Sequence, residues 1–187
     1  MNYSEYLIKR DDTMLLVVDV QERLLKAVLD KAGAGLISNI KILLETARLF
    51  DMPVIVTEQY RKGLGPTVEG LIDLVDKDSI HDKIYFNCMF DEAIKKDIES
   101  KGRNNVIITG IETHVCVFQT AMSLLDSGKN VIVVSDAVAS RKKENWKFAL
   151  EGMARAGAKI YPAETAAFIL LEKAGTPEFK TLSPFFK

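Results

Sequence analysis

The chain has 187 residues, of which 48% are hydrophobic, so it is long enough to bury a sizeable core. Its 25 basic residues nearly balance its 26 acidic ones, which argues against nucleic acid or an anionic membrane surface as a partner. The apolar runs are all far shorter than a membrane span requires.

Short runs rich in β-branched residues alternate along the chain with segments of helical periodicity. The predicted order is strand 14–20, helix 36–50, strands 53–58 and 83–86, helix 91–100, strand 105–110, helix 115–127, strand 130–136, helix 144–156, strand 158–162 and helix 163–171. The strands at 83–86 and 158–162 have the weaker patterns. The others lack polar alternation, as expected of strands that are covered on both faces.

This alternation predicts a single three-layer α/β/α, Rossmann-like domain over residues 1–187. We expect a mostly parallel sheet of about six strands, with the common order 3-2-1-4-5-6 and helices on both faces. Ligands of such sheets bind outside the carboxyl ends of the strands. Asp19 follows the first strand and Cys116 follows the fourth, so these two side chains are expected to share one crevice.

Cys116 stands where an apolar run ends and a helical pattern begins. In the first turn of that helix, unpaired amides and the helix dipole would favour a thiolate and could hold an oxyanion. The alternative is a buried, unreactive thiol, which is the usual state of a free cysteine and fits Cys88 in "FNCMF". His114 could form a dyad with Cys116, but a solvated or backbone-bonded histidine is the favoured interpretation.

The remaining sequence signals narrow the chemistry and the compartment. The chain has no C-x-x-C, G-x-S-x-G or G-x-x-x-x-G-K-[ST] motif. Two cysteines do not make a disulfide framework, and "MNYSEYLIKRDDT" lacks the apolar core and cleavage site of a signal peptide. We therefore expect a cytoplasmic protein.

Four segments together resemble the isochorismatase-like cysteine hydrolase family. They are "LLVVDVQERL", "VIVTEQYRKGLGPTVEGL", "DKIYFNCMF" and "GIETHVCVFQTAMSLLDSGKNVIVVSDAVASR". The likeness spans residues 14–168 and is greatest to the branch of isochorismatase domain-containing hydrolases. The family has the parallel α/β/α fold already predicted.

The resemblance implies a catalytic triad of Asp19, Lys83 and Cys116. Asp19 would accept the thiol proton and return it to the leaving group. Lys83 would lower the pKa values of both the aspartate and the thiol. The family also carries a non-proline cis peptide, which maps onto Ile111–Glu112 and would turn the Glu112 amide toward the Cys116 amide to form an oxyanion hole.

Metal dependence is not expected. Nicotinamidases, which are more distant relatives, bind a metal through an aspartate and histidines that follow the second strand. Here that segment is "DMPVIVTEQYRKGLGPTVEG", which has no histidine, and the chain has only His81 and His114. We expect neither a metal nor another cofactor.

The sequence thus predicts a metal-independent cysteine hydrolase that acts on a small amide or a related carbonyl or imidate carbon. Gln21, Gln59, Tyr60 and Thr113 are the expected substrate contacts, since they follow strand ends beside Asp19 and Cys116. The alternative from another class is a non-hydrolytic thiol sensor or binding subunit that keeps a reactive Cys116.

We also expect a homo-oligomer, with no nucleic acid or membrane as a partner. The apolar tail residues at the C-terminus, or the region of the fourth helix, would contribute to the contact, although such a tail can also pack on its own core. These tail residues are Phe179, Leu182, Phe185 and Phe186.

Overall fold

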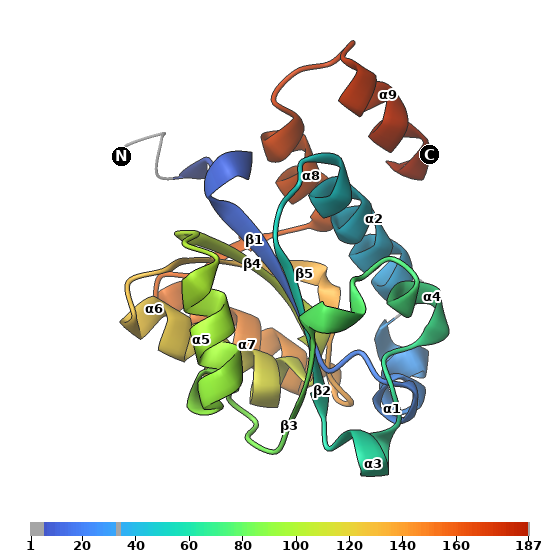
Figure 1. Cartoon of the computed structure of the whole chain (residues 1–187). Helices are drawn as coiled ribbons and strands as arrows, with labels where there is room; N and C mark the ends of the chain where they lie inside the picture. Colours follow the sequence, from blue (N-terminus) through green and yellow to red (C-terminus); the bar gives the residue numbers. More distant parts are fainter. Residues whose placement is uncertain (1–5, 33–34, 187) are drawn as a thin grey trace.

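A parallel sheet forms the centre of the computed structural model, which describes residues 6–32 and 35–186 (Figure 1). Within these residues the sheet is 6-stranded, and its order is β3-β2-β1-β4-β5-β6, as predicted. The strands are β1 (Thr13–Val18), β2 (Val54–Gln59), β3 (Ile80–Lys83), β4 (Asn105–Ile111), β5 (Asn130–Ala139) and β6 (Lys159–Tyr161). Every residue of β1 and β4 is buried, which explains why these runs show no polar alternation.

Helices cover both faces of the sheet and complete the three layers (Figure 1). One face packs under α1 (Glu22–Ala32), α2 (Gly35–Leu49), α4 (Glu69–Ile72) and α8 (Ala163–Leu171). The other packs under α5 (Glu92–Ser100), α6 (Phe118–Asp126) and α7 (Lys143–Arg155). Alternate residues of β1 serve the two cores, with Leu15 and Val17 in the first and Leu16 and Val18 in the second.

The remaining elements are short. They are α3 (Arg61–Leu64), α9 (Pro177–Leu182), the 3-10 turns η2 (Arg10–Asp12), η3 (Lys77–Ser79), η4 (Cys88–Phe90) and η6 (Ser183–Phe186), and the π-helical turn η5 (Thr113–Val117). Helix α1 was not among the predicted elements.

The third strand lies three residues earlier than predicted. Residues Ile80 to Lys83 pair with Val56 to Gln59 of β2. The apolar residues that suggested a strand at 83–86, namely Ile84, Tyr85 and Phe86, are instead more than half exposed. An apolar run marks a strand only when the sheet buries it, and here the run lies beyond the last ladder position.

The C-terminal tail packs on its own chain. Phe168 of α8 makes edge-on ring contacts with Phe179 at 6.2 Å and Phe186 at 5.1 Å, measured between ring centroids. Leu182 is fully buried, and α9 contacts α2. Of the tail residues singled out in the sequence, Phe185 is the one that is largely exposed.

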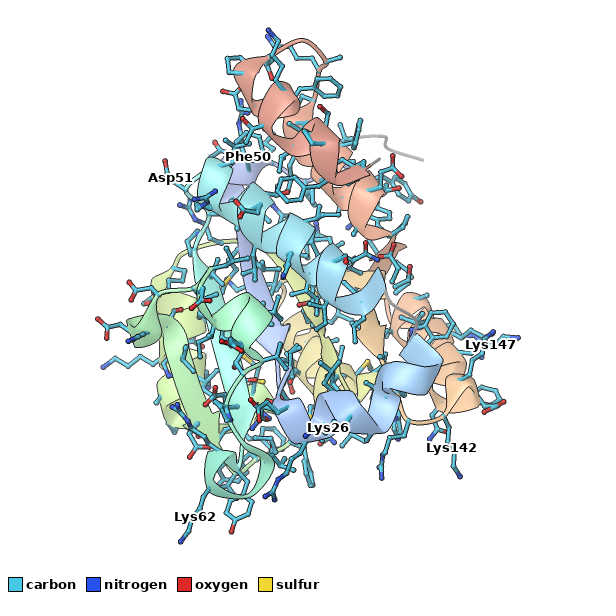
Figure 2. All side chains as sticks on the ribbon, turned by 90° about the vertical axis from the view of Figure 1, so that its right-hand side faces the viewer. Lys26, Phe50, Asp51, Lys62, Lys142 and Lys147 are labelled. Atoms are coloured by element: carbon cyan, nitrogen blue, oxygen red, sulfur yellow. The ribbon has the colours of Figure 1, made fainter. Side chains whose placement is uncertain are left out.

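The two ends of the molecule differ in what they present to solvent. Figure 2 shows Lys26, Lys62 and Lys142 at the end where the strands have their carboxyl termini, while Phe50 and Asp51 lie towards the other end.

Over the ranges that the structure describes, none of the helices combines the length and the apolar character needed to cross a membrane.

Candidate active site

An ion pair between Asp19 and Lys83 lies at the carboxyl edge of the sheet. Asp19 directly follows β1, and Lys83 ends β3, two strands away. Lys83 Nζ donates a hydrogen bond to Asp19 Oδ2 at 2.8 Å, and neither side chain is exposed. Because a buried ion pair lacks hydration, it persists only when further hydrogen bonds satisfy its remaining polar atoms.

Side chains of the intervening strand β2 provide those bonds. Thr57 Oγ1 donates to Asp19 Oδ1 at 2.7 Å, so both carboxylate oxygens have a donor. Lys83 Nζ also donates to Gln59 Oε1 at 2.7 Å and to the Tyr85 carbonyl at 3.2 Å. The ammonium therefore has three acceptors for its three hydrogens, and its position is fixed.

Two backbone features bring β1 and β4 together at this edge. Asp19 adopts the left-handed conformation with φ 55, which aspartate tolerates better than most residues. Gly110 of β4 has φ 143, and a Cβ there would lie 2.1 Å from the Val18 carbonyl oxygen. Only glycine allows β4 to approach the residue before Asp19 so closely.

Cys116 lies in η5, the π-helical turn that leads directly into α6. It is 5% exposed, and its thiol lies beside Asp19 and Lys83, whose charges both act on its pKa. The structure thus brings Asp19, Lys83 and Cys116 to one place. The sequence placed Cys116 in the first turn of an α-helix, whereas it lies in a π-helical turn. Such turns often mark functional sites.

Lys83 acts to lower the thiol pKa, as predicted, but burial and the charge of Asp19 outweigh it. Burial raises the pKa of the Cys116 thiol well above its ordinary value, and the charge of Asp19 adds to the rise, although Lys83 opposes it. Burial would lower the pKa of Lys83, but the Asp19 carboxylate and the two nearby thiols outweigh it, so the pKa of Lys83 is raised. The resting thiol is neutral because a second negative charge beside Asp19 is unfavourable.

The turn before Cys116 also differs from prediction. We expected a cis peptide bond between Ile111 and Glu112, but this bond is trans. The backbone turns instead through a left-handed Glu112, with φ 61 and ψ 63. The Glu112 carbonyl accepts a hydrogen bond from the Val115 amide at 2.9 Å, which anchors the start of the turn that carries Cys116.

A buried thiol next to a carboxylate and a fixed ammonium provides the groups that nucleophilic catalysis requires. The isochorismatase domain matches residues 13–165, which include all of these groups. The chain belongs to the isochorismatase family. The family is one of hydrolases with this three-layer fold, which agrees with the resemblance in the sequence motifs.

Similar proteins within the family have diverse descriptions. A secreted isochorismatase effector of Phytophthora sojae is 39% identical, over 94% of this chain and 84% of that protein. The structure of the MAR1 ribonuclease from Caenorhabditis elegans is 36% identical, with a TM-score of 0.87 over 96% of this chain and 91% of that one. The YcaC gene product of Escherichia coli, an octameric hydrolase of unknown specificity, is 27% identical, with a TM-score of 0.90 over 96% and 90% of the two chains.

The expected substrate contacts of this isochorismatase-family chain fall into two groups. Gln21 and Gln59 use their side-chain amides within the protein: Gln21 donates to the carbonyls of Gln59 and Gly65 and accepts from the Gln59 amide. Gln59 accepts from Lys83 and donates to the Ile84 carbonyl. The side chains of Gln21 and Gln59 therefore hold neighbouring residues of the site in place.

Tyr60 and Thr113 differ from the two glutamines and from each other. Tyr60 is 51% exposed, while Thr113 is fully buried. Thr113 Oγ1 is a buried hydroxyl without a hydrogen-bond partner in the described part of the chain. Such an atom at a site is a candidate contact for a substrate or a water molecule.

His114 does not pair with Cys116 in any hydrogen bond of the structure's described residues. Its Nδ1 lies 3.0 Å from Ser140 Oγ and 3.2 Å from Glu112 Oε2. The solvated or backbone-bonded histidine favoured from the sequence is also not what is found, since its partners are side chains. Ser140 follows β5, and only the strand register brings it to this turn.

Cys88 has a place at the site that the sequence did not suggest. Its Sγ lies 3.9 Å from Thr57 Oγ1, the hydroxyl that donates to Asp19. It is fully buried, and burial raises the pKa of its thiol to about 11. The one available signal for this contact was Thr57, a polar residue at the point where the apolar run of β2 ends.

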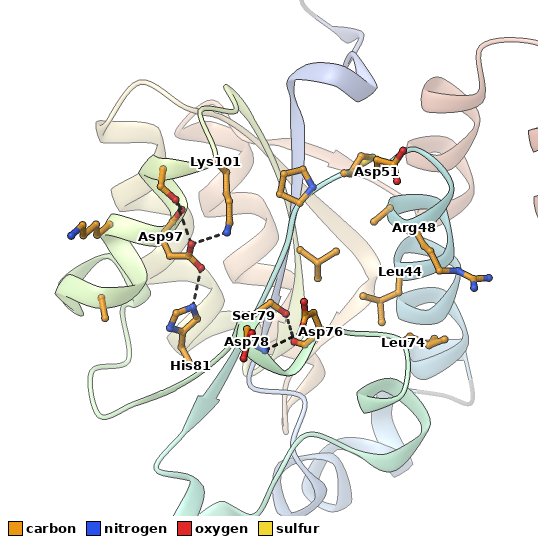
Figure 3. A pocket seen from close by; sticks show the side chains of 17 residues that line it. Leu44, Arg48, Asp51, Leu74, Asp76, Asp78, Ser79, His81, Asp97 and Lys101 are labelled. Atoms are coloured by element: carbon orange, nitrogen blue, oxygen red, sulfur yellow. Dashed lines mark hydrogen bonds and ion pairs between the residues drawn. The ribbon is translucent and has the colours of Figure 1, made fainter.

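A larger hollow of about 1040 Å³ lies elsewhere, beside the amino-terminal half of β2 between α2 and α5 (Figure 3). Three of its ionisable groups pair with one another: Asp97 accepts from Lys101 at 2.8 Å and lies 2.9 Å from His81 Nε2. The hollow is at the opposite end of the strands from Cys116, and open parallel sheets bind ligands at the carboxyl ends. We therefore place the candidate active site at the buried cluster of Asp19, Lys83 and Cys116.

The structure also bears on metal ligands. In the described ranges, no three side chains of His, Cys, Asp or Glu come together in a way that could hold a metal ion. His81 and His114 lie in the two separate clusters described above.

Proposed function

We propose that this chain is a metal-independent cysteine hydrolase that cleaves a small amide, or a related C–N or carbonyl substrate, through a covalent intermediate on Cys116. The observation that carries the proposal is the fully buried Lys83–Asp19 pair, close enough to the Cys116 thiol to act on its pKa. Burying a charge pair costs free energy, and the fold itself does not require such a pair. Buried ionisable groups beside a nucleophile are typical of active sites.

In the first half of the reaction, the Cys116 sulfur attacks the carbonyl carbon while its proton passes to Asp19. The resulting tetrahedral oxyanion collapses, the C–N bond breaks, and Asp19 returns the proton to the leaving nitrogen. Lys83 stays protonated because its pKa is raised, and its charge stabilises the Asp19 carboxylate whenever the proton is absent.

In the second half, water attacks the thioester on Cys116. Asp19 takes one proton from the water, the C–S bond breaks, and the sulfur recovers a proton. A neutral resting thiol suits this cycle, because the carboxylate that removes the proton lies beside it.

The backbone amides of Glu112 and Cys116 are the proposed oxyanion donors. Both belong to the turn between β4 and α6, and Glu112, which directly follows β4, has a left-handed conformation. Tyr60 and Thr113 are the proposed substrate contacts, supported by the exposure of the first and the unpartnered hydroxyl of the second.

Metal independence rests on the sequence of the segment after β2, which has no histidine. Ribonuclease activity, described for the C. elegans relative, is less well supported here. RNA binding relies on basic surface, and this chain has a formal net charge of −1.

The test is a screen of small amides, with RNA included, in which every activity is compared with the Cys116→Ala variant. Cys116-dependent release of ammonia or amine would support the proposal. The absence of Cys116-dependent turnover on every amide would contradict it and favour a thiol sensor. Cys116-dependent RNA cleavage would identify a ribonuclease.

A cytoplasmic homo-oligomer is the proposed state of the protein. Support for an oligomer comes from the octameric E. coli relative and from an exposed apolar strip, formed by Ile84, Tyr85, Phe86 and Phe90. The strip follows Lys83 directly, and the Tyr85 carbonyl accepts from that ammonium. A partner on this surface would cover the site beside it.

A further inference from the structure

A cluster of side chains joins the turn that carries Cys116 to the segment after β5. Arg141 Nε donates to Glu112 Oε1 at 2.5 Å. The other carboxylate oxygen, Glu112 Oε2, lies 3.2 Å from His114 Nδ1, which is also 3.0 Å from Ser140 Oγ. Glu112 and His114 of the turn therefore meet Ser140 and Arg141 of the segment after β5. These four residues form the Arg141–Glu112 cluster.

The cluster begins where the backbone pairing between β4 and β5 ends. The last ladder pair is Ile111 with Ala139, and the ladder before it is irregular, since Ile108 pairs with Val133 but Gly110 with Val138. Regular pairing would continue to Glu112 and Ser140. The left-handed turn at Glu112 stops the ladder, and side-chain contacts take its place.

The conformation of Glu112 requires such support. Its φ of 61 is uncommon for a residue with a Cβ, and such a conformation persists only where the surroundings hold it. The Glu112 side chain is only 8% exposed, and its carboxylate is paired with the guanidinium of Arg141. This pairing fixes the side chain, and through it the peptide that precedes η5.

The arrangement is not a second catalytic triad. Ser140 and Glu112 both approach the same ring nitrogen of His114, Nδ1. A serine–histidine–carboxylate relay needs the two partners on opposite ring nitrogens. No proton could pass from Ser140 through the ring to Glu112, so the cluster serves to hold atoms in place.

We propose that Arg141, acting through the Glu112 carboxylate with His114 and Ser140, is a positioning residue that holds the Glu112 amide where it stabilises the oxyanion formed on a substrate of Cys116. This inference rests on the proposed function, because it concerns the same acyl transfer. It assigns a role to exposed Arg141, which touches none of Asp19, Lys83 and Cys116 in the hydrogen bonds of the described residues.

Two reactions of the same thiol separate positioning from general stability. p-Nitrophenyl acetate acylates a thiol: the S–C bond forms, an oxyanion develops on the carbonyl oxygen, and p-nitrophenolate leaves. Iodoacetamide alkylates the thiol at a saturated carbon, with loss of iodide and a proton and without an oxyanion. Only the first reaction depends on an oxyanion donor.

The experiment measures both rates for the wild type, Arg141→Ala, Glu112→Gln and Arg141→Lys. Removing a complete oxyanion donor costs about 10²–10³-fold, so a loosened donor is expected to slow acylation about tenfold in Arg141→Ala and Glu112→Gln. Alkylation is expected to stay within about twofold of the wild type, because it bypasses the donor. Arg141→Lys should recover part of the acylation rate, since its ammonium can still pair with Glu112.

Arg48→Ala is the matched control, because Arg48 is also an exposed arginine paired with a glutamate, Glu45, but lies on α2. It should leave both rates unchanged, and the thermal midpoint of each variant shows whether it is folded. An equal fall of both rates in Arg141→Ala, or no change in either, would overturn the positioning role. Acylation that persists at the wild-type rate in Cys116→Ala would instead overturn the proposed function, and the inference with it.

Discussion

The ammonium of Lys83 lies 2.8 Å from Asp19 Oδ2, and both side chains are fully buried. Sixty-four positions separate these residues in the sequence, and they meet because β3, β2 and β1 are neighbours in one parallel sheet. The Cys116 thiol approaches the same carboxylate from η5, the turn that follows β4 on the other side of β1.

Loss of one member of this pair should destabilise the fold. We expect Lys83→Met to lower the free energy of unfolding by about 3–5 kcal/mol, because it leaves the Asp19 charge buried and unpaired. Lys101→Met is the control, since Lys101 pairs with Asp97 at the surface and should contribute about 1 kcal/mol or less. Urea unfolding measures both. Equal effects would contradict the structural importance of the buried pair.

Thiol labelling should distinguish the two cysteines. We expect iodoacetamide to modify Cys116 before Cys88, because Cys116 is 5% exposed and lies beside Asp19 and Lys83, while Cys88 is completely buried. Since the pKa of Cys116 is raised, its alkylation rate should keep rising above pH 9 instead of reaching a plateau near neutrality. Peptide mass spectrometry measures the rates, and faster labelling of Cys88 would contradict the choice of nucleophile.

Alkaline stability should reflect Cys88. Burial raises the pKa of its thiol from 9.0 to about 11, so the unfolded chain releases this proton at lower pH than the folded one. The contribution to stability is complete below pH 9 and is lost as the pH rises to about 11. Two pKa units at about 1.4 kcal/mol each give roughly 3 kcal/mol.

Urea unfolding at several pH values between 9 and 11 tests this slope. The Cys88→Ala variant has no thiol at this position, and it should lose less stability over the same range, although its cavity lowers stability at every pH. Parallel curves for the wild type and the variant would show that the alkaline loss comes from other groups, such as Lys83.

Chelation should leave the activity intact. With no histidine in the segment after β2, we expect hydrolysis, once a substrate is known, to survive prolonged dialysis against EDTA. The Cys116→Ala variant, treated in the same way, gives the background rate. Loss of activity on chelation, with recovery on adding zinc or iron, would contradict the proposed metal independence.

The exposed apolar strip should govern assembly. Light scattering at micromolar concentration is expected to give a multiple of the single-chain mass of 20.9 kDa. Phe86→Ser should weaken the oligomer, because Phe86 is 55% exposed beside the site. Phe148→Ser is the control, as Phe148 on α7 is 69% exposed and apart from the strip. A wild-type mass near one chain would refute the oligomer.

The sequence by itself determined the layers, the strand order and the pairing of Asp19 with Cys116. Runs such as "LLVV" and "VII" are apolar throughout because both faces of their strands are buried, and this property is readable without coordinates. The same physics places the residues after neighbouring strands at one edge. The motifs around Asp19, Lys83 and Cys116 then indicated the family, which the domain match confirms.

Only the tertiary structure decided which atoms meet and in what charge state. The limits of β3, the trans turn at Glu112 and the packing of the tail on α8 depend on contacts between distant segments. The neutral thiol of Cys116 follows from how deeply it is buried beside Asp19, and no local pattern encodes that depth. The contact between Arg141 and Glu112 arises where the ladder of β4 and β5 ends, so it required the register of both strands.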